Sequence, residues 1–148
     1  MTKEEKLAKF GEGPWLDEPD RVEFRVHGLP CLIRRHDELG TLCGYVAVPR
    51  THVLHGMQYR EVNSLVRLRV HGGVNYSKPC EDDVCHVPRP GEPDDVWWFG
   101  FHCSYGWDYC PVYGPWLRRD GGVEDYRDLP YVRQHTERLA LQLAAARL

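Results

Sequence analysis

The sequence contains no apolar run that approaches the roughly 18 residues of a membrane-spanning helix, which excludes a membrane span. Basic charge is not in excess either, because 19 Lys and Arg stand against 22 Asp and Glu and give a formal net charge of −3. Without a basic stripe, the chain has no surface suited to a phosphodiester backbone. We therefore expect no membrane partner and no binding to a nucleic-acid backbone.

The first ten residues carry charges where a secretory signal would have an apolar core. This predicts a cytoplasmic protein, and in the cytoplasm thiols stay reduced. A metal site built from Cys80, Cys85 and His86, with Cys103 as a fourth ligand, is one alternative, although zinc sites commonly use more closely spaced cysteine pairs. We expect all six cysteines to be free: Cys31, Cys43, Cys80, Cys85, Cys103 and Cys110.

The chain is rich in residues that build sites and turns, with eight His, five Trp, eight Tyr, 14 Gly and 11 Pro among 148 residues. This length suits a single domain. Alternation of apolar and polar residues predicts strands over 21–26, 31–35, 42–48, 65–71 and 96–103, of which the first three form an antiparallel meander.

A single amphipathic helix is predicted over 129–148, because Asp128 is a good N-cap, Pro130 fits the first turn and apolar residues recur at helical spacing. We predict an α+β domain over 21–148, in which this helix packs on a mainly antiparallel sheet. Residues 1–20 read as a frayed segment that Trp15 anchors to the domain.

Residues 79–95 combine four prolines with six acidic side chains against a single arginine, Arg89. This composition predicts an exposed loop rather than regular structure. The loop could serve as a lid. Residues 50–63, of mixed polarity, predict a loop or one turn of helix.

The first candidate site follows the strand predicted over 65–71, where two arginines and a histidine alternate with apolar residues and share one face. Guanidinium groups bind anions in a bidentate manner, and adjacent glycines let backbone N–H groups approach a phosphate or carboxylate. The alternative is a solvent-facing row that ends in a glycine turn. The candidate ligand-binding residues are Arg67, Arg69, Gly72, Gly73, Tyr76 and Ser77, with His71 as an acid or base.

The second candidate site lies on the strand predicted over 96–103 and the loop after it. By parity, Trp97, Phe99, Phe101 and Cys103 share one face, while Trp98, Gly100 and His102 share the other. A glycine inside a strand often marks close approach of a ligand or another backbone, so Trp98 beside Gly100 could stack on a planar ring. The alternative is that the aromatic residues are core and His102 is a satisfied imidazole.

If the two strands are neighbours, His71, His102 and Asp108 converge, with Tyr105 as a further ligand contact. Such a group could orient a water for acid–base catalysis or hold a metal ion. A triad of Ser77, His71 and Asp108 could also be assembled, but the chain has no nucleophile-elbow motif.

Four motifs run through the chain: Gly44-Tyr45-Val46-Ala47-Val48-Pro49, His71-Gly72-Gly73-Val74-Asn75-Tyr76-Ser77, residues 97–108, and Tyr126-Arg127-Asp128. With them the sequence resembles, over most of residues 13–143, a widespread and functionally uncharacterised family of small bacteriophage and prophage proteins. Where the family pattern has Asp and His, this chain has His102 and Tyr105. The resemblance implies a phage or prophage origin, expression in the bacterial cytoplasm, and a pocket with altered or lost catalysis.

We predict a phage accessory protein that binds, and could hydrolyse, a small anionic, nucleotide-like ligand. Small phage proteins of this kind often interfere with host defence, so a host defence component is a second candidate partner. One alternative is a metal-dependent hydrolase or nuclease that uses His71, His102 and Asp108, and this is the only hypothesis that expects a divalent metal as cofactor. Another is a non-enzymatic inhibitor that binds a host protein through residues 81–95. Each of these hypotheses is compatible with a homo-oligomer.

Overall fold

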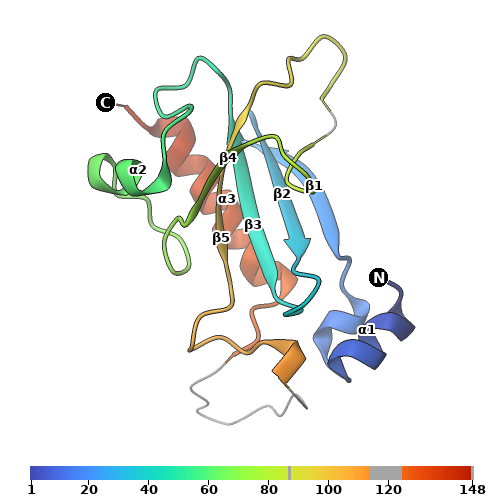
Figure 1. The fold of residues 1–148 in the computed structure, drawn as a ribbon. Coiled ribbons are helices and arrows are strands. Elements are labelled where there is room, and N and C mark those ends of the chain that lie inside the picture. The colour runs from blue at the N-terminus through green and yellow to red at the C-terminus, as the bar shows by residue number, and fades with distance from the viewer. Residues whose placement is uncertain (87, 114–124, 148) are drawn as a thin grey trace.

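The computed structural model describes residues 1–86, 88–113 and 125–147. Within them, five strands form one sheet in the order β1-β2-β3-β5-β4, and every neighbouring pair is antiparallel (Figure 1). The α+β prediction is confirmed. The elements along the chain are α1 (Lys3–Phe10), the 3-10 helix η1 (Pro14–Asp17), β1 (Arg21–Val26), β2 (Leu29–Arg35), β3 (Leu42–Val48), α2 (Tyr59–Leu65), β4 (Tyr76–Pro79), β5 (Trp97–His102), the 3-10 helix η2 (Pro111–Tyr113) and α3 (Leu129–Ala145).

Strand β3 lies in the middle of the sheet, and all of its residues are buried. Because side chains alternate across a strand, Val46 enters the core beneath α3 while Tyr45 enters a second core on the opposite face. Strand β5 follows the same rule, since Phe99 and Phe101 belong to the first core and Trp98 to the second. The predicted division of faces in β5 is therefore confirmed, and both faces of the sheet are covered.

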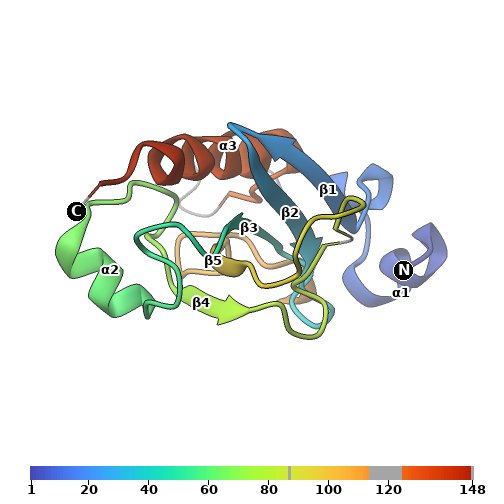
Figure 2. The ribbon, with the colours of Figure 1, turned by 90° about the horizontal axis from the view of Figure 1, so that it is seen from above.

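Helix α3 lies along one face of the sheet (Figure 2). The Asp128 side chain caps its N-terminus by accepting a hydrogen bond from the backbone N–H of Tyr131 at 3.1 Å. Burial of each large apolar side chain beneath the helix stabilises the fold by about 1.5–3 kcal/mol. The predicted helix is confirmed to Ala145, and residue 148 lies outside the described residues. The fully buried side chains of α3 include Val132, Leu139 and Leu143.

The strand predicted over 65–71 is wrong, because α2 ends at Leu65 and the segment 66–75 is irregular. The alternation behind the prediction is real, since Leu68 is buried while Arg67 and Arg69 are exposed. The partner of this segment, however, is a side chain of α3. Gln142 accepts a hydrogen bond from the N–H of Arg69 at 2.7 Å and donates one to its carbonyl at 2.8 Å. The edge strand of the sheet is instead β4, beside β5.

A loop over residues 80–96 crosses the face of the sheet opposite α3 (Figure 2). Val84 from this loop is buried with Trp98 in the second core. Arg21 donates to two carbonyls of the loop, at 2.7 and 2.5 Å, and Arg25 forms an ion pair with Glu92. The prediction of an irregular acidic loop is confirmed, but hydrogen bonds and buried side chains hold this loop against the sheet, so it is not a free lid.

The N-terminal twenty residues form the helices α1 and η1 and bury side chains, instead of a frayed segment. Helix α1 begins with a capping box, in which Thr2 and Glu5 satisfy each other's backbone N–H groups. The buried Lys6 ammonium donates to the carbonyls of Trp15 at 2.8 Å and of Glu18 at 2.6 Å. Trp15 is fully buried, so the predicted anchor is confirmed, while the prediction of a frayed segment is wrong.

The cysteines divide into two groups. Cys80 and Cys85 form a disulfide with a Cα–Cα distance of 4.8 Å, contrary to the expectation that all thiols are free. Cys31, Cys43 and Cys103 are free and buried. Burial raises the pKa of Cys31 to about 12 and that of Cys43 to about 11, so these thiols act as small apolar core residues.

Candidate functional site

The candidate site lies where three segments meet near the end of β5. These are the irregular segment 66–75, the loop over 103–110, and the first two turns of α3 with the residues just before it. His71 joins all three, because its backbone and both ring nitrogens hydrogen-bond to residues of the other two. His71 is buried, with 7% of its surface exposed.

His71 and Asp108 are the centre of the site. Nε2 of His71 lies 2.8 Å from Oδ2 of Asp108, which also accepts from the backbone N–H of Tyr105 at 3.1 Å. The other oxygen, Oδ1, accepts from Nε of Arg127 at 3.0 Å. Burial favours the neutral acid, but the hydrogen bonds from His71, Arg127 and Tyr105 outweigh it and hold the pKa of Asp108 below its ordinary value. Asp108 is therefore an ionised, fully satisfied acceptor.

The charge of Asp108 fixes the proton on the neutral His71 ring. An ionised carboxylate only accepts hydrogen bonds, so the proton of a neutral His71 lies on Nε2. Nδ1 is then an acceptor, and its partner at 2.7 Å is the hydroxyl of Tyr131. Burial raises the pKa of Tyr131, which stays a phenol near neutral pH. The result is a chain of hydrogen bonds from Tyr131 through His71 to Asp108.

A second histidine, His135, stands one helical turn after Tyr131, with the two rings 4.4 Å apart. Its Nδ1 accepts a hydrogen bond from the backbone N–H of His71 at 3.0 Å. Burial, followed by the positive charge of Arg138, lowers the pKa of His135 to about 4. His135 is therefore neutral at pH 7, with its proton on Nε2.

Three rings stack beside this chain. The Tyr105 ring lies 4.3 Å from that of His102 and 4.6 Å from that of Trp107, and the Tyr105 and Trp107 planes are parallel. The stack closes against Gly72, whose φ of 68° and lack of a side chain let the Tyr105 ring approach where a Cβ would collide. The Tyr105 hydroxyl donates to the Gly72 carbonyl at 3.1 Å. Trp107 is 46% exposed and ends the stack.

The structure thus brings together part of the predicted site. His71 and Asp108 are in direct contact, Gly72 holds Tyr105, and Gly73 follows with a φ of 84°. His102 is the inner ring of the aromatic stack. Its Nδ1 lies 2.9 Å from the Ser104 hydroxyl.

Other predicted residues lie elsewhere. Arg67 and Arg69 are exposed on the irregular segment, so they do not line a strand face. Ser77 is buried and accepts a hydrogen bond from the backbone N–H of Tyr59 at 2.8 Å, so the triad of Ser77, His71 and Asp108 is not assembled. Tyr76 packs edge-on against Tyr45 in the second core.

Trp98 cannot stack on a ligand, because it is fully buried beneath the 80–96 loop, with the His86 ring 5.6 Å away. As predicted, another group approaches Gly100 closely, but this group is the Tyr45 ring and not a ligand. The stacking surface predicted at Trp98 is therefore wrong, and the exposed indole of the site is Trp107.

The sequence-based prediction missed Tyr131, His135, Arg127 and Trp107. One signal was present, because Tyr131 and His135 are four residues apart and so share a face of the predicted helix. That signal did not connect α3 to His71, which is sixty residues from Tyr131 along the chain. Only the fold places the two together.

A metal centre of His71, His102 and Asp108 is not assembled. Both ring nitrogens of His71 and both oxygens of Asp108 already hydrogen-bond to protein groups. In the part of the chain that the structure describes, one group of three or more potential ligands clusters within 4.8 Å, and it consists of Cys80, Cys85, His86 and Asp94.

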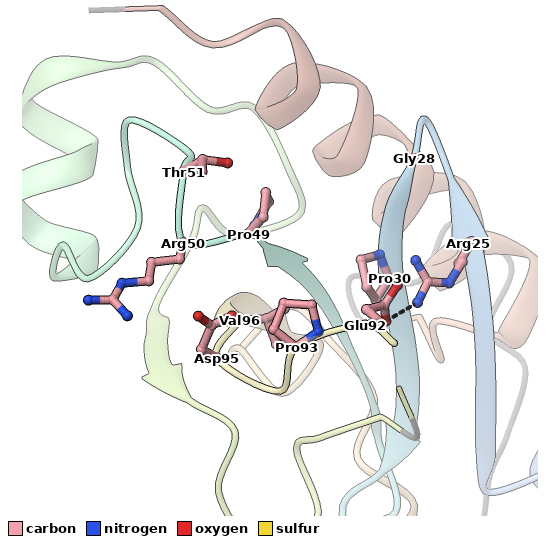
Figure 3. A pocket seen from close by; sticks show the side chains of 10 residues that line it. All are labelled: Arg25, Gly28, Pro30, Pro49, Arg50, Thr51, Glu92, Pro93, Asp95 and Val96. Atoms are coloured by element: carbon pink, nitrogen blue, oxygen red, sulfur yellow. Dashed lines mark hydrogen bonds and ion pairs between the residues drawn. The ribbon is translucent and has the colours of Figure 1, made fainter. Parts of the chain in front are cut away.

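A cavity of about 660 Å³ lies between the 80–96 loop and the sheet (Figure 3). None of the predicted site residues lines it. Its Arg25 and Glu92 side chains pair with each other, and Arg50 extends away from that pair (Figure 3). Four charged side chains, Arg25, Arg50, Glu92 and Asp95, line the cavity, but no histidine or cysteine among the described residues does, and we place the candidate site at His71.

Comparison of the chain with protein-family models, curated proteins and solved structures finds no match. The function must therefore be argued from the geometry of the site. Among the described residues, no helix has both the length and the apolar character needed to cross a membrane.

Proposed function

We propose that the protein binds a small anionic, nucleotide-like ligand beside Trp107 and Tyr131 and hydrolyses a phosphate ester bond in it. The observation that carries the proposal is the chain of hydrogen bonds from Tyr131 through His71 to Asp108. It has the order of a nucleophile–base–carboxylate triad, with a phenol in the place of serine.

The geometry supports Tyr131 as the nucleophile. Its oxygen attacks phosphorus, Nδ1 of His71 takes the phenolic proton, and Asp108 stabilises the imidazolium that forms. The bond from phosphorus to the leaving oxygen breaks, and that oxygen receives the proton from His71. Water then attacks the tyrosyl phosphate ester and gives a proton through His71 to the departing Tyr131 oxygen. The net reaction consumes one water and releases an alcohol and a phosphate.

The surroundings of Tyr131 suit an anion with a planar ring. The Arg127 guanidinium lies 4.9 Å from the Tyr131 ring, and Tyr131 stands in the first turn of α3, where the helix dipole favours negative charge. The Nε2 proton of His135 adds a neutral donor. The exposed Trp107 offers a face on which a base could stack.

Titration calorimetry and chromatographic turnover assays with a nucleoside monophosphate, a cyclic mononucleotide and a cyclic dinucleotide test the proposal. We expect at least one probe to bind and be hydrolysed. Tyr131→Phe should lower turnover by about 10³-fold or more while leaving the affinity nearly unchanged, because only the hydroxyl is removed. Trp107→Ala should weaken binding by about 1–3 kcal/mol, the value of one base stacked on an aromatic ring.

The matched control is Tyr113→Ala, which removes another exposed aromatic side chain, 78% exposed, and should leave binding unchanged. Absence of binding by every probe would contradict the ligand class. Equal turnover by wild type and Tyr131→Phe would contradict the nucleophile. A phage origin and a role against host defence stay predictions from the family resemblance.

A further inference from the structure

A second cluster of reactive side chains lies in the 80–96 loop. One ligand atom from each of Cys80, Cys85, His86 and Asp94 lies within 4.8 Å of the others. The Sγ atom of Cys85 is 3.8 Å from Oδ1 of Asp94. In a tetrahedral zinc site with bonds of about 2.0–2.3 Å, neighbouring ligand atoms are roughly 3.3–3.8 Å apart. The four ligand atoms are therefore close enough to surround one metal ion after the two sulfurs, which are bonded to each other in the structure, have been reduced and have moved apart.

His86 supplies an independent observation. It is buried, with 8% of its surface exposed, and its Nδ1 has no hydrogen-bond partner among the described residues. A buried ring nitrogen without a partner is costly. Its other nitrogen, Nε2, lies 3.1 Å from the Glu92 carboxylate. Metal-bound histidines commonly have this arrangement, in which a carboxylate holds one nitrogen and the other binds the metal.

We propose that Cys80, Cys85, His86 and Asp94 form a tetrahedral Zn²⁺ site when the two cysteines are reduced. Two thiolates, one imidazole and one carboxylate are ligands that zinc prefers. The ligand in the fourth position is Asp94, because Cys103 lies in the core on the opposite face of the sheet. The metal would link the two ends of the acidic loop, which already lies against the second core.

The disulfide and the zinc site are alternative states of the same two sulfurs. Two thiols of a cellular reductant convert the disulfide to two cysteine thiols and become a disulfide themselves. Each cysteine then releases its proton to solvent when its thiolate binds Zn²⁺. The oxidised chain has no thiolate to offer, so zinc binding requires reduction.

The test uses the full chain without a polyhistidine tag, reduced with a phosphine and titrated with Zn²⁺ against a chromophoric chelator, and in parallel with Co²⁺. We expect stoichiometric binding, and for Co²⁺ a tetrahedral spectrum with a thiolate charge-transfer band. The same chain kept oxidised should show neither. If the reduced chain shows no such band, or if the double variant Cys80→Ser, Cys85→Ser binds Zn²⁺ as tightly, the proposal is overturned.

Two matched pairs of substitutions locate the site without disturbing the core. Asp94→Asn should weaken Zn²⁺ binding at least tenfold, whereas Asp95→Asn, at the exposed neighbouring acid, should leave it unchanged. Glu92→Gln should weaken binding by about 10-fold to 100-fold through its contact with His86. Arg25→Gln breaks the Arg25–Glu92 ion pair but keeps that contact, and so should have the smaller effect. Equal affinities within either pair would contradict the assigned ligands.

Discussion

The imidazole of His71 has a partner on each nitrogen, so in the proposed reaction Nδ1 reaches the leaving oxygen or a water only after the Tyr131 oxygen has turned to phosphorus. The groups that can contact a ligand before that step belong to α3, namely the Tyr131 hydroxyl and Nε2 of His135. The contact between His71 and Asp108 was predicted from two neighbouring strands, although the segment that ends at His71 is irregular and not a strand. The contact with Tyr131 was not, since no periodic pattern relates a residue on a helix to one on an irregular segment.

His135 should make stability depend on pH. Its pKa is about 4 in the folded chain against an ordinary value of 6.5, so between these values the unfolded chain binds the proton that the folded chain excludes. The free energy of unfolding should therefore fall as the pH is lowered from 6.5 to 4. His135→Asn keeps an acceptor for the His71 N–H and does not titrate. Urea unfolding at several pH values should show the variant losing about 1–2 kcal/mol less, a figure discounted for partial exposure.

The comparison between wild type and His135→Asn separates the effect of His135 on the pH dependence of stability from that of the carboxylates. Asp108 also has a lowered pKa, so its contribution to stability is lost as the pH falls below about 5, but this loss is common to wild type and His135→Asn and cancels between them. The other ionisable neighbours of His135, namely Arg138, His71 and Arg127, are present in both chains. Parallel curves for wild type and His135→Asn between pH 4 and 6.5 would show that the imidazole does not resist protonation.

The alternation of apolar and polar residues predicted a strand correctly where the segment pairs with a strand on each side, as β5 does with β3 and β4. In β5 the alternation of Phe99 and Phe101 with Trp98 gave the correct faces. The same alternation over 65–71 predicted a strand that does not exist, because Gln142 of α3 supplies the hydrogen bonds of Arg69. Burial of every second side chain indicates an extended backbone. That backbone is a strand only if its hydrogen bonds go to the backbone of a neighbouring strand.

The first turn of α3 should depend on its cap, because it carries Tyr131. Asp128→Ala removes the acceptor for the Tyr131 N–H and should lower the free energy of unfolding by about 1 kcal/mol. Asp128→Ser keeps a capping oxygen and should lose little. Urea unfolding of both variants tests this. Equal losses for Ala and Ser would mean that the negative charge near the helix N-terminus, rather than the hydrogen bond, supplies the stabilisation.

The sheet has a cover on each side, α3 on one and the 80–96 loop on the other (Figure 2). The N-terminal residues join this assembly at the end of β2. The Arg35 side chain is fully buried there, with Nε 2.7 Å from Asp20 and Nη2 3.1 Å from Glu18. Glu18 also accepts from the backbone N–H of Leu129 at 2.6 Å, which ties the segment to the start of α3. Residues 1–20 are therefore not structurally independent of residues 21–148.

Deletion of residues 1–20 should unfold the protein or leave it marginally stable. It removes both carboxylates that pair with Arg35, and an unpaired buried charge costs about 3–5 kcal/mol. It also removes the fully buried Trp15, with a loss of similar size. The sum is comparable to the whole free energy of unfolding of an ordinary domain, about 5–15 kcal/mol. Thermal unfolding followed by circular dichroism measures the effect.

A second substitution separates the contributions of charge and of packing to the stability that is lost when residues 1–20 are deleted. Arg35→Met in the shortened chain removes the unpaired guanidinium but leaves the cavity of Trp15, so it should restore part of the lost stability. In the full-length chain the same substitution breaks satisfied ion pairs and removes the guanidinium that Glu18 and Asp20 share, so it should destabilise. Opposite signs in the two backgrounds are expected if the N-terminal segment neutralises Arg35. A shortened chain that unfolds at the temperature of the full chain would contradict the role of the segment altogether.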